Sequence, residues 1–119
     1  MNIKKHTITG TDIAEIIADE VLIRSADDGT DLLGNIYYNG FDKVILHEYQ
    51  ITPDFFNLKN GMAGEVLQKF STYRVKLAIV GDFSKYDRQS MKDFINESNK
   101  MGHVNFVSSV SDAIERLVK

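Results

Sequence analysis

The alternation of apolar and polar residues predicts a strand pair at the start of the chain. Residues 3–9 and 12–17 are rich in β-branched and apolar side chains, and Gly10-Thr11 between them is typical of a turn. The second run contains I-A-E-I-I, which also suits one face of a helix, so residues 12–17 are open between strand and helix. The chain is therefore predicted to begin with a hairpin.

Further along the chain, apolar residues recur at helical spacing in four segments. The first of these helices is predicted to be capped by Ser25 or Asp27, and the last by Ser111 or Asp112, because short polar side chains accept the free N–H groups of a helix start. A further short helical turn is predicted to start at Pro53. The four segments are residues 25–38, 61–73, 90–102 and 111–118.

Three apolar runs lack this spacing and are typical of strands that are covered on both faces. They are residues 43–49, 76–80 and 104–107, and all three are expected at or near the centre of the sheet. Strands that alternate with helices imply right-handed crossovers and parallel pairing. The predicted fold class is therefore α/β: an N-terminal strand pair, then alternating helices and strands in a mixed, largely parallel sheet with helices packed on it. One domain is expected over residues 1–119.

Composition and charge exclude several function classes. The 119 residues carry a formal net charge of −3, and Lys and Arg are scattered, so no basic surface for nucleic acid is expected. The chain has no cysteine, which excludes disulfides, thiolate catalysis and cysteine-ligated metals. It has no apolar run that could cross a membrane and no secretory signal at its start. We therefore expect a cytoplasmic protein without a nucleic-acid or membrane partner.

The order of several motifs resembles the STAS domain of anti-sigma factor antagonists. These motifs are V-I-L-H, F-F-N-L-K-N-G-M-A-G-E-V-L, K-L-A-I-V-G and F-V-S-S-V-S-D-A-I-E-R-L, which follow one another between residues 43 and 117. More closely, D-F-F-N-L-K-N-G-M-A-G-E with L-A-I-V-G-D-F-S looks like a small bacterial family of standalone domains of unknown function. The resemblance implies a STAS-like fold and a regulatory role through protein contact, with no assigned activity.

One position of the STAS pattern differs in this chain. In that family a phosphorylated serine lies directly before the loop glycine, and the residue before Gly61 here is Asn60. Because asparagine has no hydroxyl group, the resemblance does not carry a serine phosphorylation switch to this position. Thr52 and Ser84 are nearby hydroxyl groups that could take its place, and the sequence selects neither.

The motif N-G-M-A-G-E, residues 60–65, lacks the features of a nucleotide-binding loop. Such loops have more glycines or a Gly-Lys-Ser/Thr ending directly after a strand. We interpret the motif as a packing corner, in which Asn60 caps the helix, Gly61 relieves its first turn and Gly64 lets the helix lie close to the sheet. The functional alternative is contact with an anion or a partner at this helix N-terminus, assisted by Lys59.

Two other polar stretches end predicted strands. Asp82 is interpreted as the cap of the following turn, with a metal ligand or phosphoacceptor as the alternative. His47 and Glu48 are neighbours in a strand and point to opposite faces, so we expect His47 to be satisfied locally and not to form an acid–base pair. His6 and His103 are distant in sequence and show no ligand spacing. Neither a metal site nor a cofactor is predicted.

Paired aromatic residues are interpreted as core and rim positions. Tyr37-Tyr38, Phe55-Phe56 and Tyr73 have no positive charge gathered around them, which argues against a base-stacking platform. Exposure of Phe55-Phe56 would instead indicate a protein interface.

The loops beyond the C-terminal ends of the parallel strands are the predicted binding site, because ligands bind at this edge of such sheets. The predicted function is a non-enzymatic regulatory or binding domain, without catalytic residues. It is expected to contact an unknown protein partner at the loop before the central helix, and a homodimer is a further expectation. One alternative is a degenerate response-regulator receiver, with Asp27-Asp28 as its acidic pair and His47 in place of the acceptor aspartate. The other is a small hydrolase that uses His47, Asp54 and Asp82. The predicted binding residues are Asp54, Asn57, Lys59, Asn60, Gly61, Asp82, Ser84 and Lys85.

Overall fold

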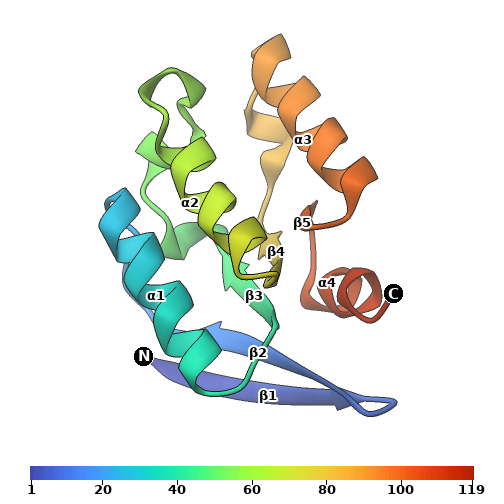
Figure 1. Ribbon diagram of the computed structural model, residues 1–119. Helices are drawn as coiled ribbons and strands as arrows, with labels where there is room; N and C mark the ends of the chain where they lie inside the picture. Colours follow the sequence, from blue (N-terminus) through green and yellow to red (C-terminus); the bar gives the residue numbers. More distant parts are fainter.

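The computed structural model describes all of residues 1–119, as a five-stranded sheet with α-helices on its two faces (Figure 1). The strands lie in sequence order; β1 and β2 are antiparallel, and β2 to β5 are parallel. The predicted α/β class and mixed, largely parallel sheet are confirmed. The elements are β1 Asn2–Ile8, β2 Thr11–Ile17, α1 Ala26–Tyr38, β3 Lys43–His47, η1 Glu48–Gln50, η2 Pro53–Phe56, η3 Leu58–Asn60, α2 Met62–Thr72, β4 Lys76–Val80, η4 Phe83–Lys85, α3 Gln89–Met101, β5 Val104–Val107 and α4 Val110–Leu117, where η marks a short 3-10 turn.

The first two strands form the predicted hairpin, and the helical alternative for residues 12–17 is wrong. β1 pairs with β2 along its whole length, beginning with Asn2 opposite Ile17. β2 also pairs with β3, so its alternate side chains face opposite sides of the sheet, and both Ala14 and Glu15 are buried. Burial on both faces gives a nearly continuous apolar run, which explains why the periodicity of I-A-E-I-I does not separate strand from helix.

Three helices, α1, α2 and α3, lie side by side over one face of the sheet (Figure 1). From β2 to β5 each crossover moves one strand further in the same direction, and right-handed crossovers of this kind place their helices on the same face. The main core lies between these helices and the sheet, and it contains Leu33, Val66, Phe70 and Ile79. α1 and α2 approach closely, because a Cβ atom at Gly29 would lie 2.9 Å from the side chain of Val66.

The opposite face is only partly covered, because α4 is the one helix that packs on it. A smaller core joins Ala113 and Leu117 of α4 to Ile13, Ile45 and Ala78 of the sheet. α4 packs against β3, β4 and β5, and the ends of β2 leave apolar surface in solvent, with Ile17 40% exposed. We call this side of β1 and β2, with the end of β3, the half-open face.

Three details of the predicted elements are wrong. β5 is an edge strand and not a central one, although α3 and α4 cover its two faces. The last helix is capped by Ser109, whose hydroxyl accepts the N–H of Asp112 at 3.1 Å, and not by Ser111 or Asp112. The strand predicted over residues 43–49 ends at His47, where the chain turns into η1.

Candidate functional site

The loop between β3 and α2 contains the turns η1, η2 and η3 and ends at Gly61, which has a φ of 78° in the region that favours glycine. The side chain of Asn60 accepts the N–H of Met62 at 2.9 Å, and it donates to the carbonyl of Asp54 at 2.7 Å. The predicted places of Asn60 and Gly61 are shifted by one residue: Gly61 is itself the N-cap of α2, without a side-chain cap hydrogen bond, and Asn60 before it satisfies the N–H of Met62. Three of the predicted binding residues, Asp54, Asn60 and Gly61, therefore hold the loop itself in shape.

Gly64 does not have the packing role that the sequence predicts. It lies on the exposed side of α2, and a Cβ atom added there would meet no atom within 4 Å. The helix needs no glycine at this position to approach the sheet. The close approach of α2 is to α1, where Gly29 faces Val66.

A groove with three positive side chains lies between this loop and the start of α3. Lys59 of η3, Lys85 of η4 and Arg88 line the groove, which has a volume of about 460 Å³ and which we call the basic groove. Lys85 pairs with Glu48, whereas Lys59 and Arg88 have no acidic partner within ion-pair distance. Asp87 is the one carboxylate in the lining. Its other side chains include Asn57, Phe56, Leu58, Tyr86 and Met91.

Asp82 and Ser84, which are also predicted binding residues, line a different hollow of about 740 Å³ beside α4. Asp82 Oδ1 accepts hydrogen bonds from the hydroxyl and the N–H of Ser84, and these bonds hold the pKa of the Asp82 carboxyl below its usual value. The interpretation of Asp82 as a cap is confirmed. The structure thus divides the predicted site: Asn57, Lys59 and Lys85 meet in the basic groove, and Asp82 and Ser84 lie apart from them.

Glu48, to which the sequence assigns no role, links the end of β3 to η4. Its side chain is 14% exposed, and Oε2 accepts from the Tyr86 hydroxyl and pairs with Lys85 Nζ, each at 2.7 Å. Burial and the Glu48 carboxylate raise the pKa of Tyr86 well above its usual value, so the hydroxyl stays protonated and donates. Gly81 leaves room for this arrangement, because a Cβ atom there would lie 2.6 Å from the Cβ of Glu48.

Gly81→Ala is expected to lower the free energy of unfolding by about 1–3 kcal/mol, because Glu48 must move and the half-buried Tyr86 hydroxyl loses its acceptor. Gly64→Ala is the matched control. Its Cβ enters open space inside a helix, so it is expected to stabilise the protein by about 0.5–1 kcal/mol. Urea denaturation measures both values. Equal effects at the two glycines would contradict the packing assigned to Gly81.

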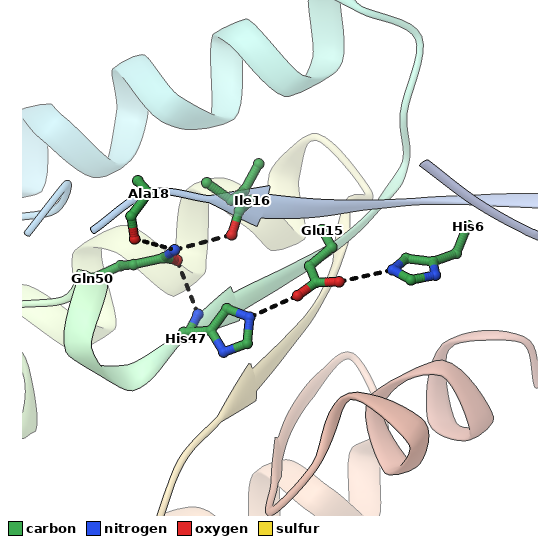
Figure 2. A network of polar contacts seen from close by, with 6 residues as sticks. All are labelled: His6, Glu15, Ile16, Ala18, His47 and Gln50. Atoms are coloured by element: carbon green, nitrogen blue, oxygen red, sulfur yellow. Dashed lines mark hydrogen bonds and ion pairs between the residues drawn. The ribbon is translucent and has the colours of Figure 1, made fainter. Parts of the chain in front are cut away.

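A buried carboxylate on the half-open face holds two histidines (Figure 2). Glu15 is 7% exposed, and its two oxygens lie 2.8 Å from Nε2 of His6 and 2.9 Å from Nε2 of His47. An ionised carboxylate can only accept, so both imidazoles donate an N–H to it. Burial by itself would raise the pKa of the Glu15 carboxyl, but the hydrogen bonds and charges of the two histidines outweigh it and hold the pKa below 4.5.

The prediction that His47 is a satisfied histidine near the end of its strand is confirmed. The sequence assigns no partner to His6, and the structure pairs it with the same carboxylate. His6 reaches Glu15 because the hairpin places β1 beside β2. The available signal was a single charged residue inside the apolar run I-A-E-I-I. No group of three His, Asp or Glu side chains is arranged to hold a metal ion.

Gln50, in the turn η1, binds the backbone at the C-terminal end of β2 (Figure 2). Its side chain is fully buried, donates to the carbonyls of Ile16 and Ala18 at 2.9 and 3.3 Å, and accepts the N–H of His47 at 3.0 Å. These hydrogen bonds hold the turn η1 against the end of β2, and so they position Glu48 and Tyr49, which follow β3.

The exposed-interface alternative for Phe55-Phe56 is wrong, because these side chains are only 1% and 7% exposed. Phe56 stacks on Tyr86 with 4.9 Å between ring centroids, which fixes η2 against the segment after η4. Tyr37 and Tyr73 make an edge-to-face contact at the exposed rim of α1 and α2. Phe56 and Tyr86 thus form part of the wall of the basic groove, whereas Tyr37 and Tyr73 lie outside it.

Comparison with known proteins shows the family of the chain. A family model described as a domain of unknown function, DUF4180, matches residues 8–117. This chain belongs to the DUF4180 family. No curated protein matches its sequence.

One solved structure is similar to this DUF4180 chain along nearly its whole length. It is a candidate anti-sigma factor antagonist from Thermotoga maritima, with a TM-score of 0.51, 12% sequence identity, and coverage of 98% of this chain and 95% of that one. At this identity the likeness shows the fold alone, and the DUF4180 chain has the STAS-like fold that its motifs imply. None of its helices has the length and apolar character needed to span a membrane.

Proposed function

We propose that this DUF4180 chain is a non-enzymatic regulatory domain that binds another protein, with the basic groove and residues 57–61 as its contact surface. The observation that carries the proposal is the pair Lys59 and Arg88, two exposed cations that have no acidic partner in the chain and that lie beside apolar groove walls. Apolar surface with a charged, solvated rim is typical of protein interfaces. The description of the similar structure as an anti-sigma factor antagonist supports a role in protein contact.

The proposed contact does not depend on a phosphorylation switch. Asn60 has no hydroxyl group, and its amide is engaged in two hydrogen bonds within the loop. The Thr52 hydroxyl accepts the N–H of Asp54 at 3.4 Å, and the Ser84 hydroxyl donates to Asp82. The Thr52 hydroxyl thus caps η2 and the Ser84 hydroxyl is bound to the cap of η4, Asp82, so both are engaged locally, and we expect binding by the unmodified chain.

The receiver alternative is not supported by the topology. In receiver domains the strand order is 2-1-3-4-5, whereas the strands here lie in sequence order. Asp28 of the supposed acidic pair accepts the N–H of Arg24 at 2.9 Å, and its own N–H donates to Ser25, the N-cap of α1, at 3.2 Å. The acidic pair thus lies in the first turn of α1, where negative charge is stabilising.

The hydrolase alternative also lacks a supporting constellation. His47 is held by Glu15 on the half-open face, Asp82 is bound by Ser84 beside α4, and Asp54 lies in the loop that Asn60 holds. The three residues belong to separate networks. A reaction that needs them together has no geometric basis.

The test is a pull-down from host lysate with the wild type and the double variant Lys59→Glu/Arg88→Glu. The amount of bound partner is expected to fall about tenfold or more in the variant, because like charges then face the partner. Both side chains are exposed and unpaired, so the free energy of unfolding should change by less than about 0.5 kcal/mol each. Asn60→Asp is unsuitable as a test, because it removes the donor to the Asp54 carbonyl.

The matched control is Lys5→Glu/Lys92→Glu, which makes the same charge change at exposed positions outside the groove. This variant should recover the partner as the wild type does. Equal recovery by the groove variant would contradict the proposed surface, and equal losses in the two variants would show that net charge alone governs binding.

A further inference from the structure

A second depression adjoins the basic groove. This apolar hollow has a volume of about 500 Å³, and Val21, Tyr49 and Ile51 line it. Four residues line both depressions: Pro53, Phe56, Lys85 and Tyr86. The two therefore form one continuous surface beside the C-terminal ends of β3 and β4, with an apolar half and a positively charged half.

The apolar half suits a large aliphatic or aromatic side chain. Tyr49 is 59% exposed, and its ring stacks on His47 with 5.4 Å between centroids, so it offers apolar surface in a defined position. Glu48 also lines the hollow, but its carboxylate is already bound by Tyr86 and Lys85. A nonpolar side chain that enters the hollow would therefore not bury an unpaired charge.

The charged half favours carboxylates. The charge of Lys85 is balanced by its partner Glu48. The remaining charges that line the groove are those of Lys59, Arg88 and Asp87, which leaves a net charge of one positive unit. The whole chain carries a net charge of −3, so an acidic segment is repelled by most of the surface and attracted here. Two free cations are too few to bind a nucleic-acid backbone tightly.

We propose that the partner docks on this surface with an acidic peptide segment, in which one large apolar side chain lies within a few residues of one or two carboxylates. The apolar side chain enters the apolar hollow, and the carboxylates reach Lys59 and Arg88. An apolar anchor in a pocket next to charge-specific contacts is a frequent way of recognising a peptide. This inference rests on the proposed function and adds the chemistry of the partner.

The test is a selection of short linear peptides from a random displayed library on the full chain. Sequencing is expected to show Asp and Glu enriched within a few residues of Leu, Phe or Trp.

Synthetic copies of the selected peptides are then titrated into the wild type and its variants, and backbone amide shifts in NMR spectra map the contact. We expect the affinity to fall about tenfold or more in Lys59→Glu/Arg88→Glu and about threefold or more in Tyr49→Ala. It should be unchanged in Lys5→Glu/Lys92→Glu, and thermal unfolding checks that each variant is folded.

Four other outcomes would overturn the inference. Peptides that shift the amides of residues 57–61 and 85–88 without an excess of acidic residues would overturn the acidic-segment inference and leave the proposed contact surface standing. Peptides that shift only amides elsewhere would overturn both. Inorganic phosphate that binds the same amides at micromolar concentration and displaces the peptides would replace the peptide carboxylate with a phosphate ligand. A selection without any enrichment would also overturn the inference.

Discussion

Replacement of Ile79 by alanine is expected to lower the free energy of unfolding by about 2–5 kcal/mol. Ile79 is fully buried in β4, an interior strand, within the core under α1, α2 and α3. Strands on both sides and helices above it limit how far the site can collapse, so the lost side chain leaves a cavity. Urea denaturation, with both midpoint and slope recorded, measures the change.

Ile17→Ala provides the control for Ile79→Ala. Ile17 lies at the end of β2 and is 40% exposed, so truncation there should cost less than about 1 kcal/mol. A loss below about 0.5 kcal/mol for Ile79→Ala would mean that β4 is not a core strand.

Glu15→Ala is expected to cost about 3 kcal/mol at neutral pH, because His6 and His47 each lose a hydrogen bond to a charged acceptor worth about 1.5 kcal/mol. The stability lost in Glu15→Ala should depend on pH. The pKa of Glu15 in the folded protein lies below the 4.5 of an unperturbed glutamate. Its contribution to stability is therefore fully present above pH 4.5 and is lost as the pH falls through the folded-state pKa. The stabilities of the wild type and the variant should converge in acid.

Glu20→Ala is the matched control for this pH dependence. Glu20 is exposed and makes no hydrogen bond or ion pair, so its removal should leave the stability close to that of the wild type across the same pH range. A difference between the wild type and Glu15→Ala that stays constant while NMR shows the Glu15 carboxyl of the folded protein becoming protonated would show that the ionised carboxylate is not what holds the histidines.

The sequence predicts at which edge of the sheet the candidate site lies, but not which side chains share one surface there. The rule for parallel sheets correctly brings Lys59 and Lys85 together beyond the strand ends. The same rule cannot tell on which side of a turn each side chain lies, and so it grouped Asp82 with them. Arg88 was missed because it precedes a helix and follows no strand directly. Tertiary packing, including that of Phe56 on Tyr86, brings the start of α3 next to η3.

The glycines show the same limit at single residues. Gly61 could be assigned a role from its place at a loop-to-helix junction, because a positive φ is a local property. Gly64 and Gly81 look equally suited to close packing in the sequence, yet one faces open space and the other faces Glu48. The neighbour of Gly81 is Glu48 in the turn η1, 33 positions earlier in the chain, and no local pattern contains it.

The local pattern of residues is enough to predict the alternation of strands and helices and several element ends. The strands at residues 76–80 and 104–107 are as predicted, because their apolar runs and the flanking turn residues act over a few neighbouring positions. The place of β5 at the edge, the division of the predicted site and the link from His6 through Glu15 to His47 depend on contacts between distant segments. Periodicity reports which face of an element is apolar, but not which distant segment covers that face. The contact between Glu15 and His47 joins residues 32 positions apart, and it exists because β2 and β3 are neighbours on a face that α4 leaves half open.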